Sequence, residues 1–393
     1  MTGWLDDFLL AHHDELIAFR RHLHAHPELS YEEHATTELL SERLRVSGLS
    51  PQVLSSGTGL ICDIGAGDGP VVALRADIDA LAMEDETDTP YRSQRPGRSH
   101  ACGHDLHTTV VLGAGLALAA SPIADGCAAR LLFEPAEETV PGGAPIVIAD
   151  GGLDRVAAIF GFHADPKLDV GRVGLRPGPL TSAADMVQIT LHGPGGHTAR
   201  PHLTVDLAAV AGRLAAGLTA TVAEHAGERG DLLAVLGAIH TGDAANVIPT
   251  TAVLRGSVRT PDRALWADAE SIVASAVAAL TDGSGARVEI DYRRGVPPVV
   301  NSEAETALMA RIVRRELGPD GVAEAAQSLG GDTFAWYQER VPGCYARLGV
   351  HDPRWGIERR DLHSGAFDVD ERAIAIGVRL LVRAVLERPT AGA

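Results

Sequence analysis

Short apolar runs alternate with helical patterns along most of this chain, and the alternation limits the folds available to it. Four runs have the length and composition of strands: residues 59–65, 71–77, 129–135 and 156–163. They show little polar alternation, which is typical of strands covered on both faces. Helices are expected at 4–25 and 32–47, and again at 104–120 between the strands. The sequence therefore predicts an α/β domain with a mainly parallel sheet.

The order of elements changes after residue 184. The next segment has the expected order strand, helix, strand, strand, helix, strand: 186–193, 203–226, 231–240, 250–260, 262–281 and 287–295. This is the ferredoxin-like split arrangement. We therefore predict a catalytic α/β domain formed by residues 1–184 and 297–393, with an inserted α+β domain at 185–296.

Composition and charge narrow the class of protein. The chain has 393 residues, of which 45% are hydrophobic and 22% charged, as in an ordinary globular protein. Its net charge is −18, whereas nucleic-acid binding depends on clustered cations, so no nucleic-acid partner is expected. No apolar run approaches the ~18 residues of a membrane span, and the acidic N-terminal segment lacks the basic region of a signal peptide. We expect a cytoplasmic protein with no membrane partner.

Several common catalytic motifs are absent from the sequence. Lys167 is its only lysine, which excludes a Walker A loop. Neither G-x-S-x-G nor H-E-x-x-H occurs, so the sequence offers no nucleophile elbow and no zincin helix. Residues 110–118 resemble part of a dinucleotide fingerprint, but Leu118 stands where the third glycine should be. We expect a closely packed helix there instead.

Other cysteines and histidines are expected to be structural. Three cysteines have the scattered spacing of small core residues: Cys62, Cys127 and Cys344. Three histidines spaced by two are expected at a surface or interdomain helix end: His22, His24 and His26.

The segment SHACGHDLH at 99–107 concentrates possible metal ligands. It contains one thiol and three imidazoles, and Cys102 and His104 are two residues apart. A looped backbone can present both side chains on one side, and zinc and similar metals accept thiolate and imidazole ligands. A zinc ribbon would need a second cysteine pair, which is missing, so further ligands must come from distant parts of the chain. The alternative is a helix N-terminus with ordinary polar residues.

Further acidic and imidazole groups follow the predicted strands. Glu137 and Glu138 come after the third strand, and His163 ends the fourth. Ligands bind at the carboxyl ends of parallel strands, so these positions suit a site, although a lone histidine at a strand end can equally be structural. Neighbouring side chains on a strand point to opposite faces. Both glutamates reach one site only if the backbone leaves the strand, which Pro135 allows.

Two acids, Asp77 and Asp79, end the second predicted strand among apolar neighbours. A carboxylate in such a place can accept the outward N–H of a ligating histidine and fix its tautomer.

Nine segments together resemble the M20 metallopeptidase clan, in its amidohydrolase branch. That branch includes aminoacylases, hippurate hydrolases and hydrolases of auxin–amino acid conjugates. The resemblance covers nearly the whole chain and rests on these segments in order: RRHLHAHPELSYEE, ALRADIDAL, HACGHDLHT, PAEE, GPGGHTARPHLTVD, NVIP, RGSVRT, VPGCYARLG and LHSGAFDVDERA.

The resemblance implies a site for two divalent metal ions per subunit. Zn²⁺ or Mn²⁺ are expected first, with Co²⁺ and Ni²⁺ as alternatives. Glu137 matches the general base, and Asp79 matches an acid that supports a ligand. The implied metal ligands are Cys102, His104, Glu138, His163 and His363.

The inserted segment resembles the lid domain of this family, which also carries a dimer interface. A homodimer or tetramer is therefore implied. His197 matches a histidine that polarises the scissile carbonyl, in its own or the partner's active site. Asn246 and Arg259 match positions that hold the substrate carboxylate. Two departures concern the substrate pocket. GGDTF stands at 330–334, where many relatives have Ser/Gly-Glu-Asp-Phe. HSG begins at His363, whereas relatives often have Pro or Gln-Pro-like residues after this histidine.

The implied activity is hydrolysis of the amide bond of N-acyl amino acids. One alternative is a dipeptidase or carboxypeptidase of the same clan, which would call for an acidic group to meet the substrate ammonium. Another is a metal-binding protein without turnover. The presence of Glu137 argues against the second alternative, because a base is not needed to hold metal.

Overall fold

The computed structural model describes residues 3–65, 70–121, 128–355 and 359–388, and it divides into two compact units. Unit 1 comprises Met1–Gly178, Val300–Ala326 and Thr333–Ala393. Unit 2 comprises Pro179–Val299 and Gln327–Asp332. Each unit has its own hydrophobic core and is described by itself.

Unit 1 is built on a sheet with the strand order β1-β2-β4-β3-β5-β16-β6-β15. A separate short ribbon pairs β7 with β14. The elements in chain order are α1 (Gly3–Ala25), α2 (His34–Val46), β1 (Gln52–Val53), β2 (Leu60–Ile64), β3 (Val71–Asp77), α3 (His104–Ala119), β4 (Ala129–Glu134), α4 (Ala144–Ala149), β5 (Val156–Asp169), β6 (Val173–Leu175), β7 (Gly178–Pro179), β14 (Val300–Asn301), α7 (Glu303–Leu317), β15 (Val322–Glu324), α8 (Phe334–Gln338), β16 (Gly343–His351) and α9 (Arg372–Glu387).

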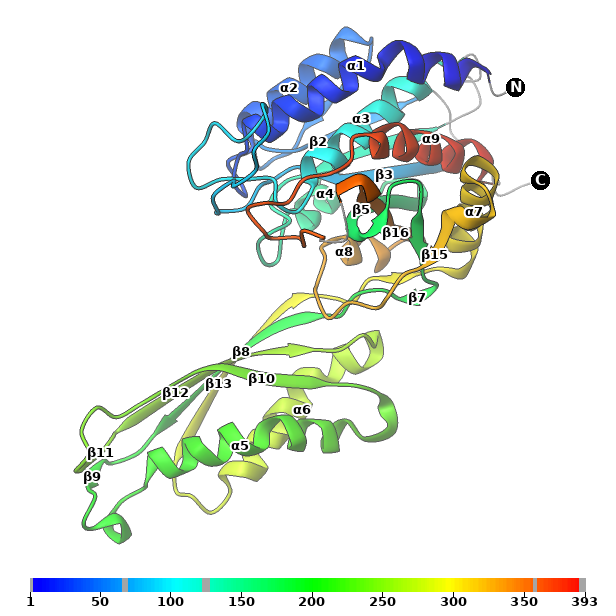
Figure 1. Cartoon of the computed structure of the whole chain (residues 1–393). Coiled ribbons are helices and arrows are strands. Elements are labelled where there is room, and N and C mark those ends of the chain that lie inside the picture. Colours follow the sequence, from blue (N-terminus) through cyan, green and yellow to red (C-terminus); the bar gives the residue numbers. More distant parts are fainter. Residues whose placement is uncertain (1–2, 66–69, 122–127, 356–358, 389–393) are drawn as a thin grey trace. The chain divides into compact units, whose positions relative to one another are not determined.

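The centre of this sheet is parallel and covered on both faces. Strands β4, β3, β5 and β16 run in the same direction, whereas β2 and β6 are antiparallel to their neighbours β4 and β16. Helices α1, α3 and α9 contact one another on one face, and α4 and α8 contact strands of the sheet from the other (Figure 1). The prediction of a mainly parallel α/β domain is confirmed.

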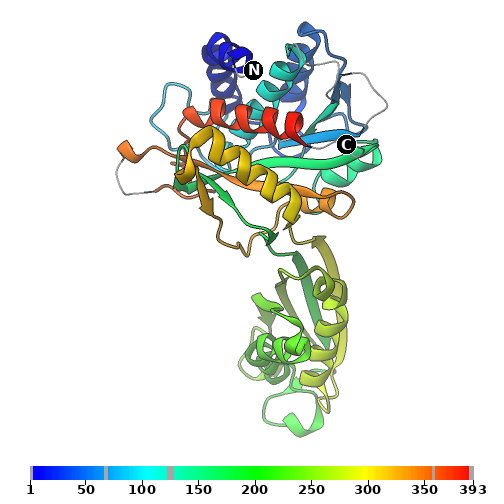
Figure 2. The same ribbon diagram turned by 90° about the vertical axis from the view of Figure 1, so that its right-hand side faces the viewer.

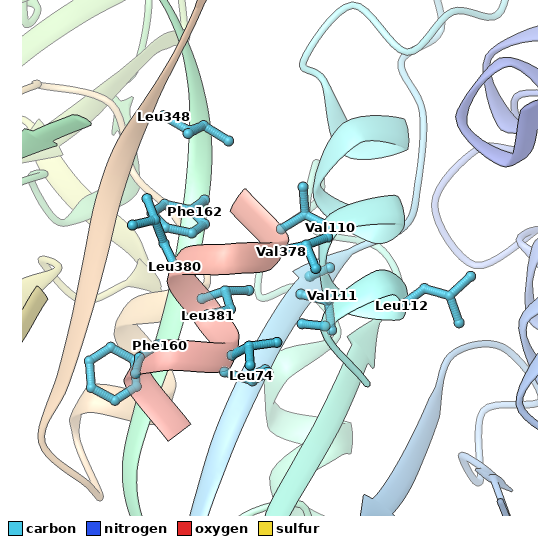
Figure 3. Close-up of a cluster of buried hydrophobic side chains, with 14 of the residues drawn as sticks. Leu74, Val110, Val111, Leu112, Phe160, Phe162, Leu348, Val378, Leu380 and Leu381 are labelled. Carbon is cyan, nitrogen blue, oxygen red and sulfur yellow. The ribbon is translucent and has the colours of Figure 1, made fainter. Parts of the chain in front are cut away.

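The core of unit 1 lies between α3, α9 and the sheet. Figure 3 shows side chains of α3 and α9 packed with Leu74 of β3 and Phe160 of β5. The packing leaves no room at two glycines of α3: an added Cβ would lie 2.7 Å from a methyl of Val378 at Gly113, and 2.3 Å from Leu131 at Gly115. Residues 110–118 therefore form a packed helix rather than a dinucleotide loop, as predicted. Burial of α3 fixes the position of its first turn, which begins at His104.

The remaining cysteines can be compared with their predicted role. Cys62 and Cys344 are buried among apolar side chains of this core, as predicted. Cys127 lies outside the described residues.

Unit 2 is an antiparallel sheet covered by two helices, which lie side by side (Figure 2). Its four-stranded sheet has the order β10-β12-β8-β13, and β9 pairs with β11 in a separate ribbon. The middle strands are thus the first and third of the sheet in sequence, which is the ferredoxin-like order, as predicted. The elements are β8 (Ala184–His192), β9 (Gly196–His197), α5 (Leu207–Ala226), β10 (Leu233–Thr241), β11 (Val247–Ile248), β12 (Thr251–Arg259), α6 (Arg263–Thr281) and β13 (Arg287–Val296).

Two helical segments of unit 2 are long and apolar enough, by length and composition, to cross a membrane: Leu207–Arg229 and Arg263–Thr281. Their apolar residues pack in the hydrophobic core of unit 2. Leu214 and Leu218 of α5 and Val273 of α6 are buried in its core. Both helices thus have the pattern expected of helices that cover a sheet with one face.

Candidate metal centre

The site lies where the parallel strands of unit 1 end. Strands β3 and β4 stop together, with Asp77 paired to Glu134. On β5, Gly161 pairs with Arg75, so His163 is level with Asp77. The prediction that His163 ends its own strand is wrong, because β5 continues to Asp169 alongside β16. Its neighbours β3 and β4 do stop at this level, however, so His163 still lies at the carboxyl edge where ligands bind.

The turn after β4 brings Glu137 and Glu138 to this edge. Ala136 adopts a left-handed conformation with φ 56° and takes the chain off the strand. The Ala136 N–H donates to Glu33 Oε1 at 2.7 Å, and the Glu138 N–H donates to Asp79 Oδ2 at 3.0 Å. Side-chain oxygens of both glutamates lie within 4.8 Å of a His104 ring nitrogen and of each other. The backbone leaves the strand, so adjacent residues reach one place.

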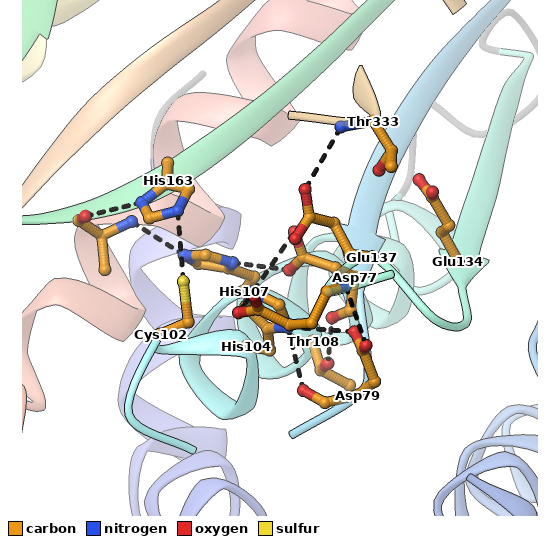
Figure 4. Close-up of polar contacts among 12 residues, drawn as sticks. Asp77, Asp79, Cys102, His104, His107, Thr108, Glu134, Glu137, His163 and Thr333 are labelled. Carbon is orange, nitrogen blue, oxygen red and sulfur yellow. Dashed lines mark hydrogen bonds and ion pairs between the residues drawn. The ribbon is translucent and has the colours of Figure 1, made fainter. Parts of the chain in front are cut away.

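The side chains expected to bind metal lie close together at the start of α3. Cys102 Sγ lies 3.5 Å from His163 Nε2, a contact visible in Figure 4. Glu138 Oε1 lies 3.7 Å from His104 Nε2 and 3.5 Å from His363 Nε2. Donor atoms of Cys102, Glu138 and His363 all lie within 4.8 Å of one another. We call these five residues the donor cluster.

The spacing within the donor cluster suits a metal. Ligands about 2.1–2.3 Å from a tetrahedral zinc are themselves about 3.5–3.7 Å apart. The contacts of Glu138 with His104 and His363 have this length. His104 Nε2 and Glu138 Oε1 are also buried without a hydrogen-bond partner in the described part of the chain. Buried polar atoms are costly to leave unsatisfied, and a cation between these two would satisfy both.

The electrostatics of the donor cluster also favour a cation. Burial raises the pKa of the Cys102 thiol well above its ordinary value. Burial would lower the pKa of His104, but Asp77, Cys102 and Asp79 hold it well above the usual range. A dication stabilises a thiolate and can take the place of the imidazole proton.

His163 has the protonation state that a ligand needs. Burial, together with the charge of Arg347, lowers the pKa of His163 well below its ordinary value. The imidazole is therefore neutral. Its Nδ1–H donates to the Ala164 carbonyl at 2.7 Å, which leaves Nε2 directed toward Cys102.

Asp79 lies where it can orient His104. His104 Nδ1 is 2.9 Å from the Asp79 carbonyl and 3.2 Å from its Oδ1. The Ser30 hydroxyl donates to Asp79 Oδ2 at 2.7 Å. These contacts place the proton on Nδ1 of His104 and leave Nε2 for a metal, which is the role that the family resemblance implied for Asp79.

A neighbouring group of Asp77, His104 and His107 could also hold a metal by distance alone. Its hydrogen bonds argue against that use. His107 Nδ1 donates to Asp77 Oδ1 at 2.6 Å, and its Nε2 accepts the Ala164 N–H at 2.8 Å. Both ring nitrogens are therefore used. The motif at 99–107 does not by itself indicate this role for His107, although His107 lies three residues after His104 on one helix face, a spacing typical of neighbouring side chains.

The catalytic candidate His197 and the two substrate-binding candidates, Asn246 and Arg259, lie in unit 2. His197 and Asn246 lie beside each other where β9 pairs with β11, and the Thr198 N–H donates to the Asn246 carbonyl at 3.3 Å. Both side chains are exposed. Arg259 ends β12, half-buried, and its Nη1 donates to the Leu329 carbonyl at 2.6 Å. Their roles remain predictions.

The prediction of a surface or interdomain position is wrong for His24, which is buried within unit 1. Its Nδ1 lies 2.8 Å from Asp105 Oδ2, and its Nε2 lies 3.4 Å from Asp85 Oδ2. Arg20, one helical turn earlier, is also buried, and its Nε forms an ion pair with Asp105 Oδ2 at 2.7 Å. This network ties the end of α1 to the first turn of α3, directly beside His104. The partners are distant in sequence, so the histidine spacing alone could not show it.

We expect His24 to make stability depend on pH. Burial and Arg20 lower its pKa, but Asp105 and Asp85 outweigh them and raise it to about 9 from 6.5. The stabilisation is then fully present below pH 6.5 and lost as the pH rises through 9. We expect the difference in free energy of unfolding between wild type and His24→Gln to be smaller, by roughly 1–3 kcal/mol, at high pH. Urea unfolding on both sides of this window measures it, and an unchanged difference would contradict the assignment.

Comparison with known proteins places the chain in a family. Residues 73–387 match the model of peptidase family M20/M25/M40. The N-acetyl-L-cysteine deacetylase of Bacillus subtilis is 37% identical over 361 residues, which is 92% of this chain and 85% of that protein. The crystal structure of Bacillus subtilis YXEP, described as a dinuclear metal-binding peptidase of the M20 family, superposes with a TM-score of 0.83 at 32% identity, covering 96% of this chain and 98% of that one.

A longer relative shows which names of similar proteins cannot be applied to this chain. A Rhodococcus jostii protein named as a glutamate–cysteine ligase 2-3 is 46% identical over 368 residues, which is 94% of this chain. The chain spans only 46% of that relative's length, so the ligase name does not carry over. The family model, in contrast, covers most of this chain, and relatives of similar length match nearly end to end. The chain belongs to the M20/M25/M40 peptidase family and is a metal-dependent amidohydrolase of that family.

Proposed function

We propose that this enzyme hydrolyses N-acyl amino acids to a carboxylic acid and a free amino acid. The observation that carries the proposal is the turn after β4, which holds a second carboxylate, Glu137, beside the donor cluster. Glu137 Oε1 accepts the Thr333 N–H at 3.2 Å. The similarity to a deacetylase of an N-acetylated amino acid supports the substrate class.

In the proposed reaction, the donor cluster, Glu137 and His197 have separate roles. Two dications held by the donor cluster would lower the pKa of a water molecule towards roughly 7 and polarise the scissile carbonyl. Glu137 takes a proton from the attacking water and delivers it to the leaving nitrogen. His197 donates a hydrogen bond to the carbonyl oxygen as negative charge develops there. A thiolate among imidazoles suits Zn²⁺, and we propose Zn²⁺ or Mn²⁺ as the native metals, with Co²⁺ and Ni²⁺ as alternatives.

A substrate panel tests the proposed function. N-acetyl, benzoyl, long-chain acyl and indoleacetyl derivatives of a set of amino acids are compared with dipeptides that have a free amino terminus. We expect higher kcat/KM for the N-acyl compounds, because a relative with 37% identity is named as a deacetylase of an N-acetylated amino acid. Higher kcat/KM for the dipeptides would favour the dipeptidase alternative. Metal binding without hydrolysis of any compound would favour a protein without turnover.

We propose that Arg259 binds the substrate carboxylate through its planar fork of N–H donors. Arg259→Ala should then raise KM for N-acyl amino acids about 10- to 100-fold with little change in kcat. The matched control is Arg255→Ala, which removes the same charge from an exposed side chain on the same strand. An N-acyl amino acid amide, which lacks the carboxylate, should show the same KM in wild type and Arg259→Ala. An unchanged KM for the acid would remove this role.

We also propose that the enzyme is a cytoplasmic homodimer in which His197 acts in the partner's site. A mixture of His197→Ala and Glu137→Gln subunits, after exchange, tests this. Half of the dimers would be mixed, and each would have one intact site of two, so activity should recover to about a quarter of the wild-type value. No recovery by dimers that have exchanged subunits would place His197 in its own subunit's site.

A further inference from the structure

Arg75 is a buried cation behind the donor cluster. Only 1% of its surface is exposed, and it lies on β3 between two buried carboxylates. Its Nε donates to Glu134 Oε2 at 2.7 Å, and its Nη1 donates to Asp77 Oδ2 at 2.6 Å. Burying a guanidinium is costly even when it is paired, and an apolar cluster of similar volume often stabilises a core as well or better. Arg75 therefore calls for an explanation beyond stability.

The third contact of Arg75 leads toward the proposed base. Its Nη2 donates to Thr333 Oγ1 at 2.7 Å, and the Thr333 N–H donates to Glu137 Oε1 at 3.2 Å. Thr333 is itself 1% exposed. Thr333 thus donates to the Glu137 carboxylate through its backbone N–H and accepts from Arg75 through its side-chain hydroxyl. Figure 4 shows the hydrogen bond from the Thr333 N–H to the Glu137 carboxylate as a dashed line.

The other partners of Arg75 are fixed in turn. The Tyr337 hydroxyl donates to Glu134 Oε2 at 3.0 Å. Asp77 accepts from His107 and lies 3.8 Å from His104 Nε2. The guanidinium is therefore linked through Asp77 to His104 of the donor cluster. Its planar fork sets the position of the Thr333 hydroxyl relative to that cluster, which a flexible ammonium could not do.

We infer that Arg75 and Thr333 are positioning residues that hold Glu137 in its working orientation. The inference rests on the proposed function, in which Glu137 is the base. A base acts only within hydrogen-bond reach of the proton that it takes, and a small displacement is expensive in rate. Loss of the Arg75–Thr333 contact should therefore lower kcat while the metal ligands and the substrate-binding residues remain in place.

The test begins with Thr333→Val. This change removes the hydroxyl that Arg75 contacts but keeps the backbone N–H and most of the volume. We expect kcat to fall about 10- to 100-fold, with KM and metal content changed less than about twofold. Thr333→Ser retains the hydroxyl and should keep kcat within about threefold of wild type. Thr306→Val is the control for loss of a buried hydroxyl, since Thr306 donates to the Ser302 carbonyl in α7, away from the site.

A second variant and a double-mutant cycle separate positioning from general damage. Arg75→Lys keeps the charge between Asp77 and Glu134 but loses the fork, so it should lower kcat in the same way even if Thr333→Val does not fold. The Arg75→Lys/Thr333→Val enzyme should be no slower than the slower single variant, because each substitution alone already removes the same hydrogen bond between Arg75 and Thr333. In a Glu137→Gln background, Thr333→Val should change the residual kcat less than about threefold, because no base is left to position.

The outcomes distinguish this inference from the proposed function. Wild-type kcat in both Thr333→Val and Arg75→Lys would overturn the positioning role, as would an equal loss of kcat with and without Glu137. Near-normal kcat in Glu137→Gln alone would instead overturn the assignment of the base, whatever the Thr333 variants do.

Discussion

Replacing Glu137 with glutamine should lower kcat about 10²- to 10⁴-fold and leave the metal content unchanged. Glutamine has nearly the same shape, and its oxygen can still accept the Thr333 N–H that Glu137 Oε1 accepts at 3.2 Å. It cannot take a proton, so only the chemical step is affected. The measurement is steady-state kinetics on an N-acyl amino acid together with metal per subunit by mass spectrometry.

The neighbouring residue provides the control for this result. Glu138→Gln changes the same charge one residue along the same turn, but there the altered group belongs to the donor cluster. We expect it to weaken metal binding, which Glu137→Gln should not do. Equal metal loss in both variants would show that the two glutamates share one role, and near-normal kcat in Glu137→Gln would remove it as the base.

Removing a residue at the centre of the donor cluster should have the second large effect. Glu138 lies within 3.7 Å of His104 and 3.5 Å of His363, so Glu138→Ala removes an oxygen that both histidines face. Loss of residues that merely orient ligands costs about 10- to 100-fold in metal affinity, and loss of a ligand should cost more. We expect fewer than two metals per subunit and negligible turnover at ordinary metal concentrations.

Stability offers a second measurement of the same change. Metal that binds the folded chain stabilises it by an amount that rises with the logarithm of its affinity. The melting temperature of wild type should therefore fall on chelation, and that of Glu138→Ala should fall much less. Full metal occupancy in Glu138→Ala, with wild-type melting behaviour, would exclude Glu138 as a ligand.

The fold could be predicted well because its pattern is local. Apolar runs and helical periods near each other in sequence indicated the central strands and both helices of unit 2. The strand boundary that was predicted wrongly depends on pairing between segments far apart in the sequence. The extension of β5 beyond His163 follows from its pairing with β16, nearly two hundred residues later in the chain, and no local pattern contains that information.

The candidate site could likewise be predicted where its residues are close in sequence, but not where they are distant. Cys102 and His104 are neighbours in sequence, so their spacing alone indicated a metal. Spacing also placed Glu137 and Glu138 at the same strand end, but only resemblance to a family distinguished base from ligand. Residues held by long-range polar contacts were missed, since a buried polar residue is recognisable only with its partners. Arg75 and Thr333 are 258 positions apart, and His24 contacts Asp105 across 81.

Titration of metal-free enzyme with Zn²⁺ or Mn²⁺, while hydrolysis of an N-acetyl amino acid is followed, tests the central claim most directly. We predict no turnover without metal and a rise in turnover as metal binds, complete at about two dications per subunit. Glu137→Gln should bind the same amount of metal without turnover. Hydrolysis that persists unchanged in the metal-free enzyme, or metal-loaded enzyme that hydrolyses no N-acyl amino acid, would contradict the account.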